Sequence, residues 1–226
     1  MAKSILVVAA HPDDEVLGCG GTVARLIKEG CKAYTLILGE GVTSRSKGVG
    51  DKRLKLKIAT LKKQMQKANK ILGINQVFSY SFADNKFDSV PFLEIVKVIE
   101  EIKNKIKPEI IFTHWSDDLN IDHRIIYQAV LTATRPLPGE SVKQLFSFEV
   151  LSSSEWRYDK QFLADTLFDI TRTLKQKLCA MKAYKLELKN SRHPRSLKGI
   201  LLNAEYRGIG NGLKYAEAFK SVRVIR

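Results

Sequence analysis

The hydrophobic pattern alternates between short apolar runs and longer amphipathic segments. Apolar runs that predict strands occupy residues 4–10, 32–38, 76–81, 109–114, 142–151 and 221–225. Apolar residues recur at helical spacing over 52–72, 90–106, 125–134 and 171–189, and a helical pattern resumes over 22–29 after a glycine-rich stretch. Strands that alternate with helices predict an α/β fold, in which helices cover a mostly parallel central sheet.

The first predicted strand ends in a group of polar residues. His11, Pro12, Asp13, Asp14 and Glu15 follow the apolar run directly. Such strand-to-helix loops carry the sites of open α/β sheets. His11 and Asp14 offer one imidazole and one carboxylate, a pair that suits Zn²⁺ or a similar divalent ion, while Asp13 can act as a base. The alternative is that the acids only cap a helix, which leaves His11 unexplained.

A second polar stretch follows the predicted strand 109–114. A zinc site with His11 and Asp14 needs a third protein ligand and an open position for water. We predict that His123 is this ligand, because it begins a helix beside the same sheet edge. His114 is the weaker alternative, since a histidine inside a strand is more often packed than ligating.

The His-Pro-Asp-Asp-Glu motif between a hydrophobic strand and a glycine-rich helix start resembles the LmbE-like/PIG-L family of zinc-dependent N-acetylglucosaminyl deacetylases. The late sequence Tyr-Ala-Glu-Ala-Phe, residues 215–219, is also typical of that family, so the resemblance extends through most of the chain. It implies a Rossmann-like three-layer sandwich (the LmbE-like fold), one Zn²⁺ per chain, and hydrolysis of an N-acetylated amino sugar to acetate and a free amine.

The chain departs from this family at two places. Family members commonly read His-x-x-His before the last ligand, and here Asn120 stands at the first of these positions, so the group that assists the tetrahedral intermediate is in question. Many members also carry Arg-x-x-Glu in the helix that here spans 52–72, where this chain has Leu61 and Gln64. Arg45, in a long Gly/Ser-rich loop, is therefore the candidate to contact substrate, and the alternative is a solvated loop arginine.

His193 is the one histidine outside the two strand-end motifs, and it lies in a basic turn. One interpretation is a surface turn. The other, which we test, is that His193 reaches the cavity from its own chain or a neighbouring subunit, contacts substrate and donates a hydrogen bond to the oxyanion, alongside Asn120.

The net charge of +14 indicates which kinds of partner the protein could bind. A basic surface suits nucleic acid, anionic lipid or an anionic small substrate. Basic and aromatic residues are not interleaved as in stacking sites, so we expect no nucleic-acid partner. The expected partner is a small-molecule or glycoconjugate amino-sugar substrate, for which the basic charge favours an anionic form, and a second copy of the chain, in a homo-oligomer, is the other candidate partner.

The bulk properties predict a single domain over residues 1–226. Three scattered cysteines form no disulfide framework, and the start of the chain shows no signal-peptide pattern, so we expect a cytoplasmic protein. No apolar run is long enough to cross a bilayer.

Two other functions fit parts of the sequence. Gly18, Gly20 and Gly21 suggest a dinucleotide-binding module, but Val23 stands at the last glycine position and three acids precede the glycines. A non-catalytic, metal-dependent sugar- or nucleotide-binding protein would keep the same ligands without turnover. Release of acetate separates the enzyme from both.

Overall fold

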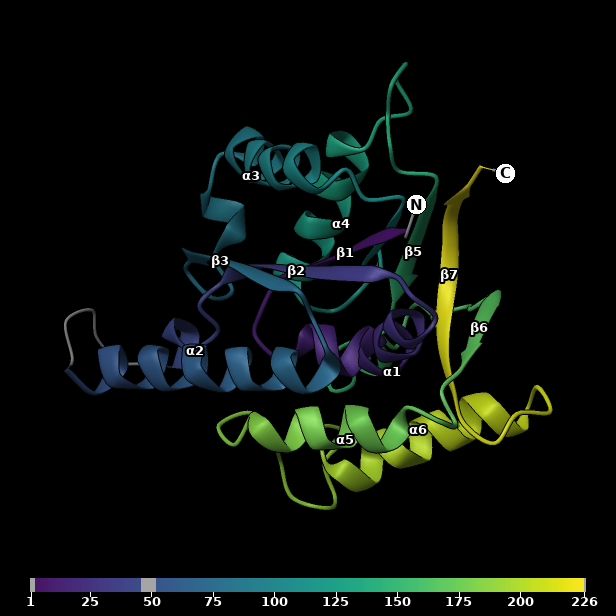
Figure 1. Cartoon of the computed structure of the whole chain (residues 1–226). Helices are drawn as coiled ribbons and strands as arrows, with labels where there is room; N and C mark the ends of the chain where they lie inside the picture. Colours follow the sequence, from purple (N-terminus) through teal and green to yellow (C-terminus); the bar gives the residue numbers. More distant parts are fainter. Residues whose placement is uncertain (1–2, 46–51, 226) are drawn as a thin grey trace.

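A seven-stranded sheet forms the centre of the computed structural model, which describes residues 3–45 and 52–225 (Figure 1). The strand order is β3-β2-β1-β4-β5-β7-β6. Strands β1 to β5 run parallel, and β7 is antiparallel to both β5 and β6. The strands are Ser4–Ala9 (β1), Lys32–Gly39 (β2), Gln76–Phe82 (β3), Ile110–His114 (β4), Gln144–Phe148 (β5), Thr166–Asp169 (β6) and Ala216–Val224 (β7).

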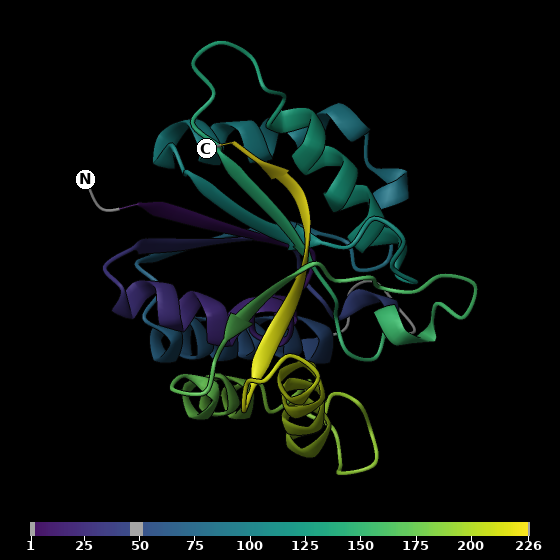
Figure 2. The same ribbon diagram turned by 90° about the vertical axis from the view of Figure 1, so that its right-hand side faces the viewer.

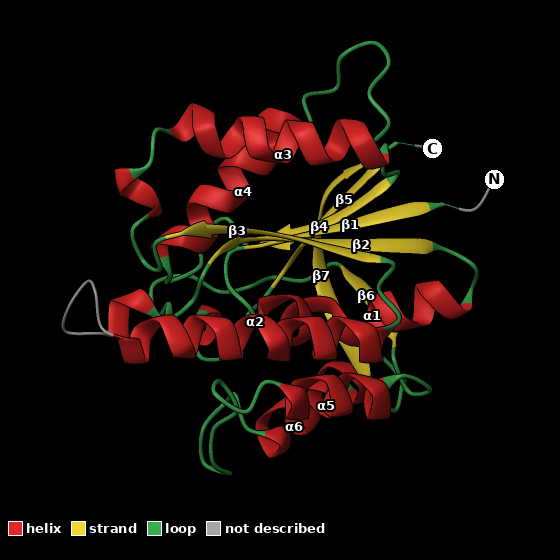
Figure 3. Cartoon of the chain, turned by 60° about the vertical axis from the view of Figure 1, so that its left-hand side comes forward, coloured by secondary structure: helices red, strands yellow, loops and turns green. Residues whose placement is uncertain are grey.

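Helices cover both faces of the sheet and complete three layers (Figure 3). On one face lie α3 and α4, and on the other lie α1 and α2, with α5 packed against both and α6 against α5 and β7. The helices are Asp14–Lys28 (α1), Lys52–Leu72 (α2), Phe92–Ile106 (α3), Ile121–Ala133 (α4), Leu174–Ala183 (α5) and Leu197–Ile209 (α6). Short 3-10 helices span Thr43–Arg45, Phe87–Ser89 and Ser154–Trp156. The predicted α/β class and mostly parallel sheet are confirmed.

Strand β1 is buried on both of its faces. Ile5 and Val7 belong to the core beneath α1 and α2, whereas Leu6 and Val8 belong to the core beneath α3 and α4. A central parallel strand has to be apolar on both sides, which is why residues 5–10 form an unbroken hydrophobic run.

The glycine-rich stretch after the first motif is itself helical, so the helix predicted over residues 22–29 begins earlier than expected. Helix α1 already begins at Asp14 and contains Gly18, Gly20 and Gly21. A Cβ atom at Gly18 would lie 2.2 Å from the Phe148 ring. Gly18 therefore allows α1 to approach the sheet closely, and this close approach, rather than a phosphate, explains it.

The C-terminal third differs most from its prediction. The strand expected at 142–151 covers only Gln144–Phe148, and the helix expected at 171–189 is confined to Leu174–Ala183. Helix α5 ends where the Tyr184 ring becomes fully buried and its hydroxyl bonds to Glu15. Strand β6 and helix α6 were not predicted, and β7 begins earlier than expected, at Ala216.

Strand β1 lies at a topological switch point. It pairs with β2 on one side and with β4 on the other, and open α/β sheets bind ligands at the carboxyl ends of such strands. The motif that starts at His11 follows β1, and the one that starts at His114 follows β4, so the fold brings both to this edge. Strand β7 runs antiparallel beyond β5, with β6 beside it (Figure 2).

Over the residues that the structure describes, no helix is both long and apolar enough to cross a membrane.

Candidate metal and catalytic site

The carboxylates of Asp14 and Glu15 hold the turn between β1 and α1 by accepting hydrogen bonds from its backbone. The backbone N–H of His11 donates to Asp14 Oδ2 at 2.8 Å, and that of Asp13 donates to Glu15 Oε2 at 3.0 Å. Asp13 has a φ of 109°, which is uncommon for a residue other than glycine. The bond from Asp13 to Glu15 holds this conformation, in which Asp13 faces the cavity.

Glu15 also ties this turn to two helices. Its Oε1 accepts hydrogen bonds from Asn69 Nδ2 on α2 at 2.9 Å and from the Tyr184 hydroxyl at 2.5 Å. Burial raises the pKa of Glu15 to about 7, although the bond from Tyr184 lowers it. The position of Asp13 therefore depends on contacts between α1, α2 and the end of α5.

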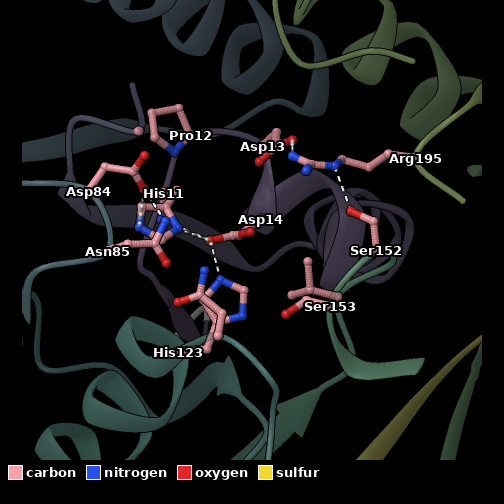
Figure 4. Close-up of a pocket in the computed structure, with 13 residues that line it drawn as sticks. His11, Pro12, Asp13, Asp14, Asp84, Asn85, His123, Ser152, Ser153 and Arg195 are labelled. Carbon is pink, nitrogen blue, oxygen red and sulfur yellow. Dashed lines mark hydrogen bonds and ion pairs between the residues drawn. The ribbon is translucent and has the colours of Figure 1, made fainter. Parts of the chain in front are cut away.

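Three nitrogen and oxygen atoms converge beside this turn (Figure 4). Asp14 Oδ2 lies 3.6 Å from His11 Nδ1 and 3.4 Å from His123 Nε2, and one atom of each residue lies within 4.8 Å of the others. His123 sits in the first turn of α4, and all three side chains are buried. Two imidazoles and one carboxylate are a known ligand set of catalytic zinc sites, so the donors fit Zn²⁺.

The second nitrogen of each imidazole is bound by carboxylates. His11 Nε2 lies 2.8 Å from Asp122 Oδ2 and 3.1 Å from Asp84 Oδ1. His123 Nδ1 lies 3.0 Å from Asp118 Oδ1. Carboxylates in this position orient metal-binding histidines and fix which nitrogen carries the proton.

These carboxylates are themselves held by neighbouring loops. Asp122 accepts hydrogen bonds from the backbone of Asn85 at 2.7 Å and of Phe87 at 3.1 Å. Asp118 accepts from the hydroxyls of Ser153 and Ser154. His11, Asp84 and Asp122 also form a compact set of possible ligands. Asp84 and Asp122 both contact His11 Nε2, so orienting the His11 ring is enough to explain why these three residues lie together.

The buried carboxylates create a strong local demand for positive charge. Burial lowers the pKa of His11, but Asp122 and Asp14 outweigh this effect and raise it to about 10. Burial likewise lowers the pKa of His123, and Asp14 and Asp118 raise it to about 9. Either two protons or one divalent cation satisfies this demand, which is the electrostatic signature of a metal site.

His114 is positioned as a packing residue. Its Nε2 accepts a hydrogen bond from the backbone N–H of Ala10 at 2.8 Å, and its ring stacks on His123 with centroids 3.9 Å apart. Burial keeps its pKa well below the usual value, consistent with a neutral acceptor. Because Nε2 is already used, His114 supports the ring of His123 rather than replacing it.

A cavity of about 170 Å³ opens onto the three converging atoms. Five of the residues singled out in the sequence line it, namely His11, Asp13, Asp14, Asn120 and His123. The other lining residues are Pro12, Gly41, Asp84, Asn85, Val150, Ser152, Ser153 and Arg195.

Arg195 is the one basic residue among the described lining residues, and the sequence did not indicate it. Its Nη1 donates to Asp13 Oδ2 at 3.0 Å and to Glu187 Oε2 at 3.3 Å, and its Nε donates to Ser152 Oγ at 2.8 Å. Burial raises the pKa of Asp13 to about 8, while Arg195 acts to lower it. A carboxyl group with a pKa near neutrality is suited to general-base catalysis.

The remaining predicted residues lie in different surroundings. Asn120 caps α4 through Oδ1, which accepts from the backbone of Asp122 at 2.8 Å, so only its amide nitrogen can donate to a ligand. His193 is not among the described lining residues. Its Nδ1 accepts from the backbone of Arg195 and its ring packs edge-on against Trp156. Contact from a neighbouring subunit stays a prediction.

Arg45 ends a short 3-10 helix, and its side chain lies outside the described part of the structure. Leu61 and Gln64 stand where many family members have Arg-x-x-Glu. Leu61 packs inside the core, and Gln64 accepts a hydrogen bond from the backbone N–H of Leu186.

The missed residues come from polar loops that the sequence does reveal. Asp84 and Asn85 follow β3, Ser152 and Ser153 follow β5, and Arg195 lies in the basic turn of His193. The position of the first four directly after strands was the signal in the sequence that could have identified them as site residues. The sequence could not indicate which member of the basic turn faces the cavity.

Comparison with known proteins identifies the family. The family model described as PIG-L, GlcNAc-PI de-N-acetylase, matches residues 6–134. The chain belongs to this family. It is 30% identical to the Escherichia coli deacetylase YaiS over 67% of this chain and 76% of that protein. It is 25% identical to a probable N-acetyl-alpha-D-glucosaminyl L-malate deacetylase of Bacillus cereus, over 82% and 84% of the two chains.

One solved structure matches this chain along its whole length. The conserved protein TT1542 from Thermus thermophilus superposes with a TM-score of 0.78 and 27% identity, covering 100% of this chain and 97% of that chain. The likeness therefore includes the C-terminal third, which lies beyond the segment matched by the PIG-L model.

Proposed function

We propose that this PIG-L protein is a zinc-dependent N-deacetylase that hydrolyses the acetamide of an N-acetylated amino sugar. The observation that carries the proposal is the convergence of His11, Asp14 and His123 beside Asp13 in one cavity. Membership of a deacetylase family and the relatives named for N-acetylglucosaminyl compounds support the substrate class.

His11 Nδ1, Asp14 Oδ2 and His123 Nε2 would hold one Zn²⁺ per chain. When bound, zinc supplies Lewis acidity and lowers the pKa of water to about 7. Asp122 and Asp118 keep the two rings turned toward that position through the opposite nitrogens.

Asp13 acts as general base and then as general acid. It accepts a proton from the attacking water while the water oxygen bonds to the acetamide carbon. The same proton then passes from Asp13 to the amide nitrogen as the C–N bond breaks. The products are acetate and the free amine, and Asp13 ends the cycle ionised.

Arg195 and Asn120 are the candidates to stabilise charge on the acetamide oxygen. The Asn120 amide nitrogen is a neutral donor where relatives commonly have a histidine. Among the described lining residues, Arg195 is the only lysine or arginine, so it supplies the cationic character there. Donors of this kind act most strongly in a site that excludes water.

The cavity volume restricts what can enter. About 170 Å³ admits an acetamido group and the adjoining part of a sugar ring, not an extended chain. We therefore propose that the remainder of the substrate lies outside the cavity.

The decisive experiment measures acetate and free amine released from N-acetylglucosaminides by the zinc-loaded protein. Asp13→Asn should bind zinc normally and lose roughly a hundredfold to ten-thousandfold in kcat, because asparagine cannot accept the proton. Asp117→Asn, on the neighbouring loop, is the matched control and should retain activity. Zinc binding without turnover on any N-acetylated sugar would instead indicate a metal-dependent binding protein.

A further inference from the structure

The positive charge of the protein is not located in its cavity. The chain has 38 lysines and arginines against 24 acids. The described cavity lining nevertheless contains Asp13, Asp14 and Asp84, and its one guanidinium, Arg195, already contacts Asp13 and Glu187. The surplus positive charge therefore lies outside the described cavity lining.

Helix α2 concentrates this charge. Residues 52–70 contain eight lysines and arginines and no acid, and all eight are exposed. Leu54, Leu61 and Met65 pack one side of the helix into the core, and the cations occupy the rest of its circumference. A helix of this length presents a charged rod of roughly 30 Å.

Helix α5 extends the charged area sideways. Gln176 Nε2 donates to the backbone of Ile71 at 2.8 Å, and the backbone of Leu186 donates to Gln64 Oε1 at 3.1 Å. The segment 176–186 therefore runs antiparallel beside α2 (Figures 1 and 3). It adds the exposed Lys182 and Lys185 and carries no exposed acid. We call the exposed lysines and arginines of α2 and of segment 176–186 the basic platform.

The composition of the basic platform favours a membrane surface over a discrete anion. All but one of the α2 cations are lysines, which act as solvated point charges without the planar fork that arginine offers for bidentate recognition. Leu56 lies on the same face of the helix as Lys52, one turn before it, and Lys63, two turns after it, and 68% of its surface is exposed. An apolar side chain surrounded by lysines suits the boundary between lipid headgroups and acyl chains.

We propose that the basic platform docks the protein on an anionic lipid bilayer, with Leu56 entering the headgroup layer. Helix α2 also adjoins the cavity, because Leu61 packs against the backbone of Gly41, which lines it. Docking would thus hold the cavity close to sugars displayed at the membrane. Only this last consequence rests on the proposed deacetylase function.

The test is co-sedimentation of the full chain with phosphatidylcholine vesicles that contain or lack phosphatidylglycerol. We expect binding only to the anionic vesicles, and loss of binding in high salt, which screens surface charge. The triple variant K55Q/K63Q/K67Q should bind roughly a hundredfold more weakly, since each lysine at such a surface contributes about fivefold. Leu56→Gln, which leaves the charge unchanged, should weaken binding about tenfold.

A matched variant removes the same charge from the opposite side of the sheet. K97Q/K105Q/K143Q alters exposed lysines on and near α3, and it should bind vesicles nearly as wild type does. Equal losses in the two triple variants, or binding to soluble heparin but not to vesicles, would overturn the proposal. Neither readout depends on turnover, and K55Q/K63Q/K67Q should keep wild-type kcat/KM on a short soluble substrate if the proposed function is correct.

Discussion

Arg195 donates a hydrogen bond to Asp13 at 3.0 Å and so joins two residues that are 182 positions apart in the chain. The Asp13 carboxyl is almost completely buried, and its partner is only partly exposed. Arg195 Nε is anchored on Ser152 and Nη1 also reaches Glu187, so three segments fix the guanidinium. The proposed base is thereby oriented by a cation from the far end of the chain.

Replacing Arg195 should impair catalysis in a way that depends on pH. Burial raises the pKa of Asp13 and Arg195 lowers it, so Arg195→Gln should raise that pKa further. The rise of kcat/KM on the acidic side would then move to higher pH, because ionised Asp13 forms later. We expect kcat to fall roughly tenfold to a hundredfold. Arg192→Gln, an exposed neighbour in the same turn, is the control, and identical pH profiles would exclude this role.

Zinc binding should release protons. Asp14 and other carboxylates raise the pKa values of His11 and His123 to about 10 and about 9, so both rings are protonated at neutral pH without metal. A metal ion must displace these protons. Titration calorimetry of the metal-free protein in buffers of different ionisation enthalpy should give about two protons per zinc. Affinity should then increase as pH rises toward 9, and equal heats in all buffers would contradict this prediction.

The buried bond from Tyr184 to Glu15 should contribute to stability and to the position of Asp13. Tyr184→Phe removes one donor from a carboxylate that has no access to water, and a hydrogen bond to a charged group contributes about 2 kcal/mol. Chemical denaturation should show a loss of this size. The kcat should fall as well, because Glu15 holds the backbone of Asp13. Tyr206→Phe, on the exposed face of α6, should change neither quantity.

Two glycines of α1 should respond oppositely to alanine. At Gly18 a methyl group would meet the Phe148 ring at 2.2 Å, so Gly18→Ala should cost about 3 kcal/mol of unfolding free energy. At Gly20 the nearest atoms are 3.5 Å away, an ordinary contact. Gly20→Ala should therefore be neutral or stabilise the helix by up to about 1 kcal/mol. Similar denaturation midpoints for the two variants would show that α1 does not need its close approach.

The sequence predicts the parts of this fold that depend on local pattern. Strand β1 is recognisable because both of its faces are buried, and α2 because its apolar residues keep one side. The same pattern places His11 and His123 at neighbouring strand ends. In contrast, Gly18 resembles a loop residue until the position of Phe148 is known. Tertiary packing outweighs local propensity there.

Arg195 could not be found in this way because its role depends on the path of an irregular segment. Residues 190–196 carry no periodic pattern, and the helix predicted up to residue 189 ends at Ala183, after which Tyr184 and Glu187 are buried against other elements. The sequence favours His193 in this turn because it is the one histidine outside the two strand-end motifs. The backbone instead directs the side chain two positions later into the cavity.

The cavity is built from two lengths of chain. The atoms that converge on the proposed metal position all precede residue 124, whereas Val150, Ser152, Ser153 and Arg195 form a wall that comes after it. Through the bonds of Ser153 to Asp118 and of Arg195 to Asp13, this later wall also holds groups beside the proposed metal position. A fragment that ended after the first length would therefore carry every proposed ligand and still lack the contacts that orient them, so the two lengths have to be inherited together.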